Sequence, residues 1–162
     1  MWSRTFVLLA VISLQMWLYL VHHADAVPAD VDSTRPLSAR GRAQAADVAR
    51  RVAARKASPK AIWHSGKLRA RETAEIYLTA VNPSATFTAT RGLQPDDDPE
   101  WMRDLLAGEA DDLMIVGHYP FLPALLQLVC GADAAFPQHG ALALERTQGG
   151  WTERWREPIV TT

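Results

Sequence analysis

Residues 16–26 read MWLYLVHHADA, and this stretch decides the fold expected for the chain. Met16 to Val21 is an unbroken run of apolar residues, several of them aromatic or β-branched, which is typical of a strand buried on both faces. Strands of that kind belong to parallel sheets that helices cover on both sides. Polar residues follow at once, beginning with His22 and His23. The stretch therefore predicts a central strand that ends in a pair of histidines.

Working outward, strand-like runs alternate with helical patterns. Ser38 can cap a helix whose inward face carries Gly41, Ala45, Val48 and Val52 at helical spacing. The other expected elements are strands at 61–63, 85–90 and 113–116, helices at 67–80, 99–107 and 121–129, and a terminal hairpin at 141–146 and 151–155. This order predicts an α/β fold, a three-layer sandwich with a mostly parallel central sheet flanked by helices and an antiparallel terminal hairpin.

Polar groups follow three of the expected strands, namely His22-His23, His64-Ser65 and Gly117-His118. The carboxyl ends of parallel strands meet at one edge of a sheet, where ligands bind in such folds. Arg35 and Arg69 lie in the segments that follow the first two strands. Arginine forks match phosphate oxygens, and an imidazole with one free nitrogen can attack phosphorus. The pattern predicts a phosphoryl-transfer site at this edge.

Four motifs, taken in order, resemble the histidine phosphatase superfamily and its small SixA branch of phosphohistidine phosphatases. They are LYLVHHADA at 18–26, RPLSxxG at 35–41, SxxxRAxxTA at 65–74 and IVGHYP at 115–120. The resemblance implies a phosphoglycerate mutase-like fold from about residue 16 to the terminal hairpin.

The resemblance also implies roles for individual residues. His23 matches the nucleophile, Arg69 and His118 match the groups that bind the phosphoryl oxygens, and Arg35 matches an arginine beside the pocket. The implied activity is removal of phosphate from a phosphohistidine-bearing protein, such as a histidine-containing phosphotransfer domain, through a phosphohistidine on the enzyme. Neither a metal nor an organic cofactor is expected.

Two positions depart from the family pattern. His22 stands where the family has an arginine, and Ala24 stands where it has a glycine. We take His22 as a substrate-binding candidate and expect it to act in its protonated form, which predicts a loss of activity at alkaline pH. An inactive phosphate- or phosphohistidine-binding protein, with His22 as the lesion, stays as the alternative function.

A proton donor would come from Asp96, Asp97 or Asp98, and the sequence does not choose among them. Of these three residues we take Asp96 as a substrate-binding candidate. An equally good interpretation is structural, in which the carboxylates cap the helix that begins near Pro99. A phosphatase of small phosphate esters is a further alternative. The short chain argues against it, because no long insertion is available to close over a small substrate.

A metal site competes for the same histidines. Adjacent strand residues point to opposite faces, so His22 and His23 are poor joint ligands, and no spacing typical of zinc sites is present. We expect His64 to be structural and His139 to be exposed. In the hairpin, the even spacing of Trp151 and Trp155 predicts that both lie on one face of the sheet.

Composition sets the outer bounds. The chain has 162 residues, a net charge of −1 and one cysteine, which suits a single domain without a disulfide framework and gives no sign of nucleic-acid binding. Residues 1–15 are expected to be an extension before a domain at 16–162. They could be an upstream start, a signal cleaved after Ala26 or an uncleaved anchor. We expect a cytoplasmic protein that does not bind membranes.

Overall fold

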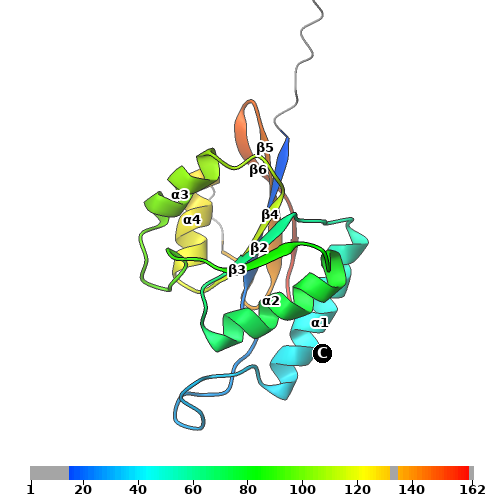
Figure 1. Cartoon of the computed structure of the whole chain (residues 1–162), viewed down its shortest axis with the longest axis vertical. Coiled ribbons are helices and arrows are strands. Elements are labelled where there is room, and N and C mark those ends of the chain that lie inside the picture. Colours follow the sequence, from blue (N-terminus) through cyan, green and yellow to red (C-terminus); the bar gives the residue numbers. More distant parts are fainter. Residues whose placement is uncertain (1–14, 132–134, 161–162) are drawn as a thin grey trace, which may run out of the picture.

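The computed structural model describes residues 15–131 and 135–160. They form a six-stranded sheet between two pairs of helices (Figure 1). In chain order the elements are β1 (Met16–His22), α1 (Ala39–Ala54), β2 (Ala61–His64), α2 (Leu68–Val81), β3 (Thr86–Ala89), α3 (Pro99–Ala107), β4 (Leu113–Gly117), α4 (Phe121–Cys130), β5 (Ala141–Thr147) and β6 (Gly150–Glu157).

The strand order is β3-β2-β4-β1-β5-β6, in which the first four strands are parallel and β5 and β6 are antiparallel to their neighbours. This arrangement confirms the predicted α/β sandwich with a terminal hairpin. β1 is central because it pairs with β4 on one side and β5 on the other. Its apolar run is buried on both faces, as the sequence of β1 indicates.

Each face of the sheet packs on one helix pair (Figure 1). Leu18 and Leu20 of β1 contact the core under α3 and α4, whereas Tyr19 and Val21 contact the core under α1 and α2. The alternation of side chains along a strand accounts for this division. The carboxyl ends of β1, β2 and β4 lie side by side at one edge of the sheet.

Helix α1 begins as the sequence predicted. The Ser38 side chain accepts a hydrogen bond from Gly41 N–H, which caps the helix. Gly41 packs so closely on the loop after β1 that a Cβ there would lie 1.9 Å from the Asp25 carbonyl oxygen. The absence of a side chain at Gly41 therefore lets α1 start directly against the segment that follows His23.

The prediction that Trp151 and Trp155 share one face of the sheet is wrong. A β-bulge interrupts the β5–β6 register, in which Ala143 pairs with Trp155 while Leu144 pairs with Glu153. The extra residue shifts the alternation by one position. As a result Trp151 packs on the core under α3 and α4, and Trp155 packs on the core under α1 and α2.

Within residues 15–131 and 135–160, no helix is both long and apolar enough to cross a membrane. The expected extension at 1–15 lies, except for Gln15, outside the described residues. The boundary expected between an extension at 1–15 and a domain at 16–162 therefore stays a prediction.

Candidate active site

His23 follows β1 directly, and its imidazole is held at both nitrogens. Nε2 accepts a hydrogen bond from Arg69 Nε at 3.2 Å, and Nδ1 lies 2.8 Å from the carbonyl oxygen of Ala24. Because Nε2 is an acceptor, the proton of the neutral ring sits on Nδ1 and is donated to that carbonyl. Burial and the Arg69 charge lower the pKa of His23 to about 4, despite the hydrogen bond to Ala24. The ring is therefore neutral at pH 7, with its lone pair on Nε2.

Arg69 lies in the first turn of α2, and Thr73 ties that turn to the loop after β1. The Thr73 hydroxyl donates to the Arg69 carbonyl at 2.7 Å and accepts from Ala24 N–H at 3.1 Å. Burial and the nearby charge of Arg35 lower the pKa of Arg69, yet a guanidinium keeps its proton in proteins. A fixed cation thus lies beside the lone pair of His23.

His118 follows β4 and packs beside His23, with ring centroids 5.0 Å apart. Ser65 Oγ accepts from Lys67 N–H at 3.3 Å and lies 2.6 Å from His118 Nε2. When the Ser65 hydroxyl donates its proton to Nε2, the proton of the neutral His118 ring is on Nδ1. That Nδ1 is buried and has no hydrogen-bond partner in the described part of the chain. In that tautomer an anion in the pocket would satisfy the Nδ1–H group, whose isolation otherwise costs about 1–3 kcal/mol.

His22 is buried among aromatic rings. Its Nδ1 accepts a hydrogen bond from the backbone N–H of His139 at 2.9 Å, and the two rings stack with centroids 4.9 Å apart. Tyr119 packs edge-on against the same ring, at 4.7 Å. Burial, and then the proximity of His23, lower the pKa of His22 to about 2. His22 is thus neutral at pH 7, and its proton must be on Nε2 because Nδ1 is the acceptor.

The two remaining candidates lie further out. Arg35 is half-buried, donates from Nε to the Val27 carbonyl at 3.3 Å, and is near enough for its charge to lower the pKa values of His23 and Arg69. Asp96 is exposed, and its carboxylate accepts no hydrogen bond within the described ranges. Its role stays a prediction.

The neighbours of Asp96 have structural partners. Asp98 caps α3 by accepting from Glu100 N–H, and Asp97 accepts from Gln94 N–H. The Gln94 side chain in turn donates to the Ser65 carbonyl at 2.6 Å, so the acidic loop is anchored to the edge of the site.

The profile of the histidine phosphatase superfamily (branch 1) matches residues 19–94, which include His22, His23, Arg35 and Arg69. A protein from Agrobacterium tumefaciens assigned as the phosphohistidine phosphatase SixA superimposes with a TM-score of 0.76 at 26% identity, covering 90% of this chain and 99% of that chain. Residues 19–94 thus match the histidine phosphatase superfamily, and the described domain shares the fold of a SixA neighbour.

Other structures of this family share the fold. The protein histidine phosphatase SixA complexed with tungstate gives a TM-score of 0.76 at 21% identity, covering 88% of this chain and 97% of that chain. A protein from Escherichia coli K-12 assigned as an α-ribazole-5′-P phosphatase gives 0.68 at 17% identity, covering 91% and 99%. No curated protein matches the chain. The predicted resemblance to the family, with SixA proteins among the structural relatives, is confirmed.

The geometry gives His22 a way to act without the protonation expected from the sequence. A neutral imidazole still donates one hydrogen bond, and the His139 amide fixes that donor on His22 Nε2. The low pKa of His22 means that this donor does not disappear between pH 6 and pH 8. In place of the family's arginine, the chain has an uncharged donor whose tautomer is set by the backbone.

Ring nitrogens of His22, His23 and His139 lie within 4.8 Å of one another, so the expectation that His22 and His23 diverge is wrong. Strand alternation ends at His22, and His23 already belongs to the following loop. A metal ligand must nevertheless offer a lone pair, and the lone pair of His22 is on Nδ1, where the His139 amide occupies it. The three rings do not form a ready ligand set for a metal in this hydrogen-bonding pattern.

Sequence reasoning misplaced His139, which was expected to be exposed. It is half-buried, donates from Nδ1 to the His23 carbonyl at 2.7 Å, and has a positive φ of 56°. No local motif marks it, because its position depends on how the chain enters β5 beside β1. His64, by contrast, is buried against Phe87 and accepts from Gly66 N–H, which agrees with the structural role expected for it.

Proposed function

We propose that this protein is a phosphohistidine phosphatase that dephosphorylates a phosphohistidine-bearing protein through a phosphohistidine on His23, without a metal. The main support is the state of His23, a neutral ring with its lone pair on Nε2 and a guanidinium 3.2 Å away. An imidazole in this form is a nucleophile, and the cation beside it can stabilise the charge that develops on the phosphoryl oxygens. A cytoplasmic location, inferred from the sequence, is part of the proposal.

In the first step, His23 Nε2 attacks phosphorus while the P–N bond to the substrate imidazole breaks. Arg69 moves its hydrogen bonds from Nε2 to the phosphoryl oxygens, joined by His118 Nδ1–H, His22 Nε2–H and Arg35. The electron pair of the broken bond returns to the substrate ring. That ring leaves as neutral imidazole when its other nitrogen carries a proton, so no strong acid is needed in the enzyme.

In the second step, water attacks phosphorus and the P–Nε2 bond breaks. The electron pair returns to His23, and the water proton leaves with phosphate or solvent. Throughout, His23 Nδ1–H donates to the Ala24 carbonyl, which stabilises the positive charge of the phosphorylated ring. The hydrogen bonds that orient His23 before reaction thus continue to serve the intermediate.

The test is mass spectrometry of the intact protein and its peptides after exposure to phosphoramidate. We expect phosphate on His23, lost on acid treatment, and no label in His23→Ala. His64→Gln is the matched control, because His64 is buried outside the pocket and glutamine can still accept from Gly66 N–H. If wild type and control bind phosphate but never carry the label, the protein is a binding module rather than a phosphatase.

A further inference from the structure

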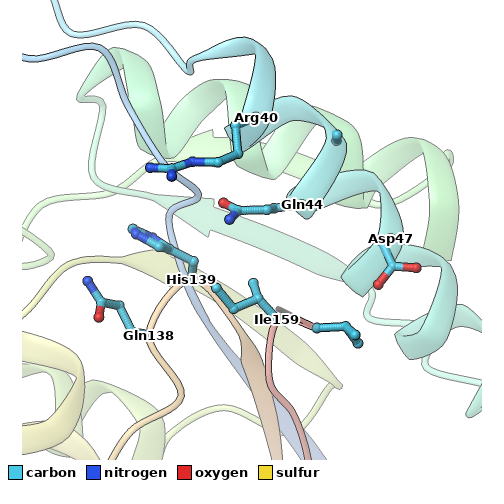
Figure 2. A pocket seen from close by; sticks show the side chains of 8 residues that line it. Arg40, Gln44, Asp47, Gln138, His139 and Ile159 are labelled. Carbon is cyan, nitrogen blue, oxygen red and sulfur yellow. The ribbon is translucent and has the colours of Figure 1, made fainter. Parts of the chain in front are cut away.

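A groove of about 700 Å³ runs along α1 beside the candidate active site (Figure 2). Helix α1 forms one side, and the segments before β5 and after β6 form the other. Its lining residues are Arg40, Ala43, Gln44, Asp47, Gln138, His139, Ile159 and Val160. The groove is thus built from parts of the chain that are more than 90 positions apart, which only the folded domain brings together.

Helix α1 has two working faces. One face packs into the core through Gly41, Ala45, Val48 and Val52. The groove uses a second stripe, Arg40, Ala43, Gln44 and Asp47, at the i, i+3, i+4 and i+7 spacing of one helix side. This stripe is about 10 Å long at 1.5 Å per residue. The domain's own core does not need it.

His139 joins the groove to the phosphoryl site. Its ring stacks on His22 and donates from Nδ1 to the His23 carbonyl, while the same side chain lines the groove. Figure 2 shows His139 at one end of the groove, opposite Arg40. A substrate whose phosphoryl group lies at His23 therefore has this groove next to it for the part of the molecule that carries the phosphate.

The lining shows what chemistry the groove suits. Its charges already have partners, since Arg40 pairs with Asp25 at 2.8 Å and Asp47 pairs with Arg50 at 2.7 Å. Between them lie the small side chain of Ala43 and the Gln44 Oε1 atom, which is buried and has no hydrogen-bond partner within the described ranges. Ile159 and Val160 add an aliphatic wall.

This combination fits a polypeptide better than a small organic ligand. Pockets for small ligands are lined mainly by hydrophobic and aromatic groups, whereas this groove has exposed walls and His139 as its only ring. A polypeptide supplies main-chain groups for the polar lining residues Gln44 and Gln138 and apolar side chains for the aliphatic wall. Because Arg40 and Asp47 are already paired, the groove does not favour a strongly charged polypeptide.

We propose that this groove binds the polypeptide segment next to the phosphorylated histidine of the protein substrate. The inference rests on the proposed function and adds to it a docking surface. It explains how a small domain without a closing insertion could prefer a protein to a free phosphate compound. The groove supplies binding energy that a small phosphoramidate cannot use.

The test compares kcat/KM for two substrates, phosphoramidate and a histidine-containing phosphotransfer domain phosphorylated on its histidine. Ala43→Trp fills the groove from an exposed helix position, and Ala46→Trp puts the same side chain on an exposed face of α1 outside it. Relative to phosphoramidate, we expect Ala43→Trp to lose about tenfold or more on the phosphorylated domain, as for truncation of a binding hot spot. Ala46→Trp should retain both activities, and Gln44→Met should show a smaller selective loss.

Binding of the same phosphorylated domain to His23→Ala, measured by calorimetry with and without the groove substitutions, gives a readout that needs no turnover. Weaker binding with Ala43→Trp but not with Ala46→Trp supports the groove. Equal binding by the two tryptophan variants, or equal losses on both substrates, overturns it. Failure of the wild type to hydrolyse phosphoramidate would instead count against the proposed function, and the calorimetry would still decide the groove.

Discussion

At the scale of single residues, the histidine that replaces the family's arginine decides how the site can work. An arginine would offer a permanent charge and a fork of donors, whereas His22 offers one N–H. The His139 backbone amide makes that one donor dependable by occupying Nδ1. Under the proposed function, His22 would therefore contact the phosphoryl group through this N–H and without a positive charge.

This assignment predicts that His22 can be replaced by another neutral side chain with a donor and an acceptor. In His22→Gln, the amide oxygen can accept from His139 N–H while the NH₂ group donates to the phosphate, so kcat/KM on phosphoramidate should change little. His22→Leu removes both contacts and should lose about 2 kcal/mol of transition-state stabilisation, roughly thirtyfold in rate. Melting temperatures of both variants control for unfolding.

The pH profile distinguishes this donor from a cation. With the pKa of His22 at about 2, its charge does not change near neutrality. Wild type and His22→Gln should therefore share one profile of kcat/KM between about pH 6.5 and pH 8.5, well above that pKa. An alkaline loss of activity that is present in the wild type and absent in His22→Gln would mean that His22 works as a cation after all.

At the scale of elements, the active site depends on how closely α1 approaches the loop after β1. A Cβ on Gly41 would lie 1.9 Å from the backbone oxygen of Asp25, and backbone cannot move aside cheaply. Gly41→Ala should therefore destabilise the fold by about 1–3 kcal/mol, the usual cost of overpacking. Elsewhere in a helix, replacing glycine by alanine usually has the opposite effect and stabilises the helix.

Gly108→Ala is the matched control, because its Cβ would meet nothing closer than 3.6 Å and its φ is −88°. Urea denaturation of the two variants checks the comparison. If Gly41→Ala is as stable as Gly108→Ala, the start of α1 is not held against the loop in the way the structure indicates.

Most elements could be predicted because each carries its own local pattern. The Ser38 cap, the small inward residues of α1 and the unbroken apolar run of β1 all appear in the structure where the sequence placed them. The bulge in the hairpin could not be predicted, because Arg154 looks like any other strand residue. One extra residue there was enough to place Trp151 and Trp155 on opposite faces.

The same distinction applies to the site. His23, Arg69 and His118 could be named because each follows a strand in a motif, and strand ends meet at one edge. The tautomers could not be named, since they depend on hydrogen bonds between residues far apart in the chain. The contact of His139 N–H with His22 spans 117 positions, and that of Ser65 with His118 spans 53.

At the scale of the whole molecule, the described fold begins with β1. Met16 is fully buried in the core under α3 and α4 and pairs with Arg146 in the sheet. A chain that starts at Met16 should therefore fold, keep its melting temperature within a few degrees and retain its activity on phosphoramidate. A chain that starts at Leu20 is the contrasting variant, because it lacks half of the central strand. Loss of soluble protein on starting at Met16 would show that the preceding residues are needed.

Stability should also depend on pH through the buried histidines. Burial is the main reason that the pKa values of His22, His23 and His118 fall to about 2, 4 and 3, below the usual value for histidine. Below about pH 6.5 these histidines bind protons in the unfolded chain but stay neutral in the folded chain. The free energy of unfolding must therefore decrease as the pH falls from about 6.5 towards 4, by about 1.4 kcal/mol per pH unit for each such histidine.

Between about pH 5 and pH 6.5 most carboxylates are still ionised in both states, so this window isolates the histidines. We expect urea denaturation there to give a free energy of unfolding that rises with pH. In His22→Gln the free energy of unfolding should depend less steeply on pH, by roughly one proton. The variant lacks one of the histidines that bind a proton only in the unfolded chain. An unchanged slope would mean that His22 titrates alike in the folded and unfolded chain, and the neutral donor inferred for the pocket would lose its physical basis.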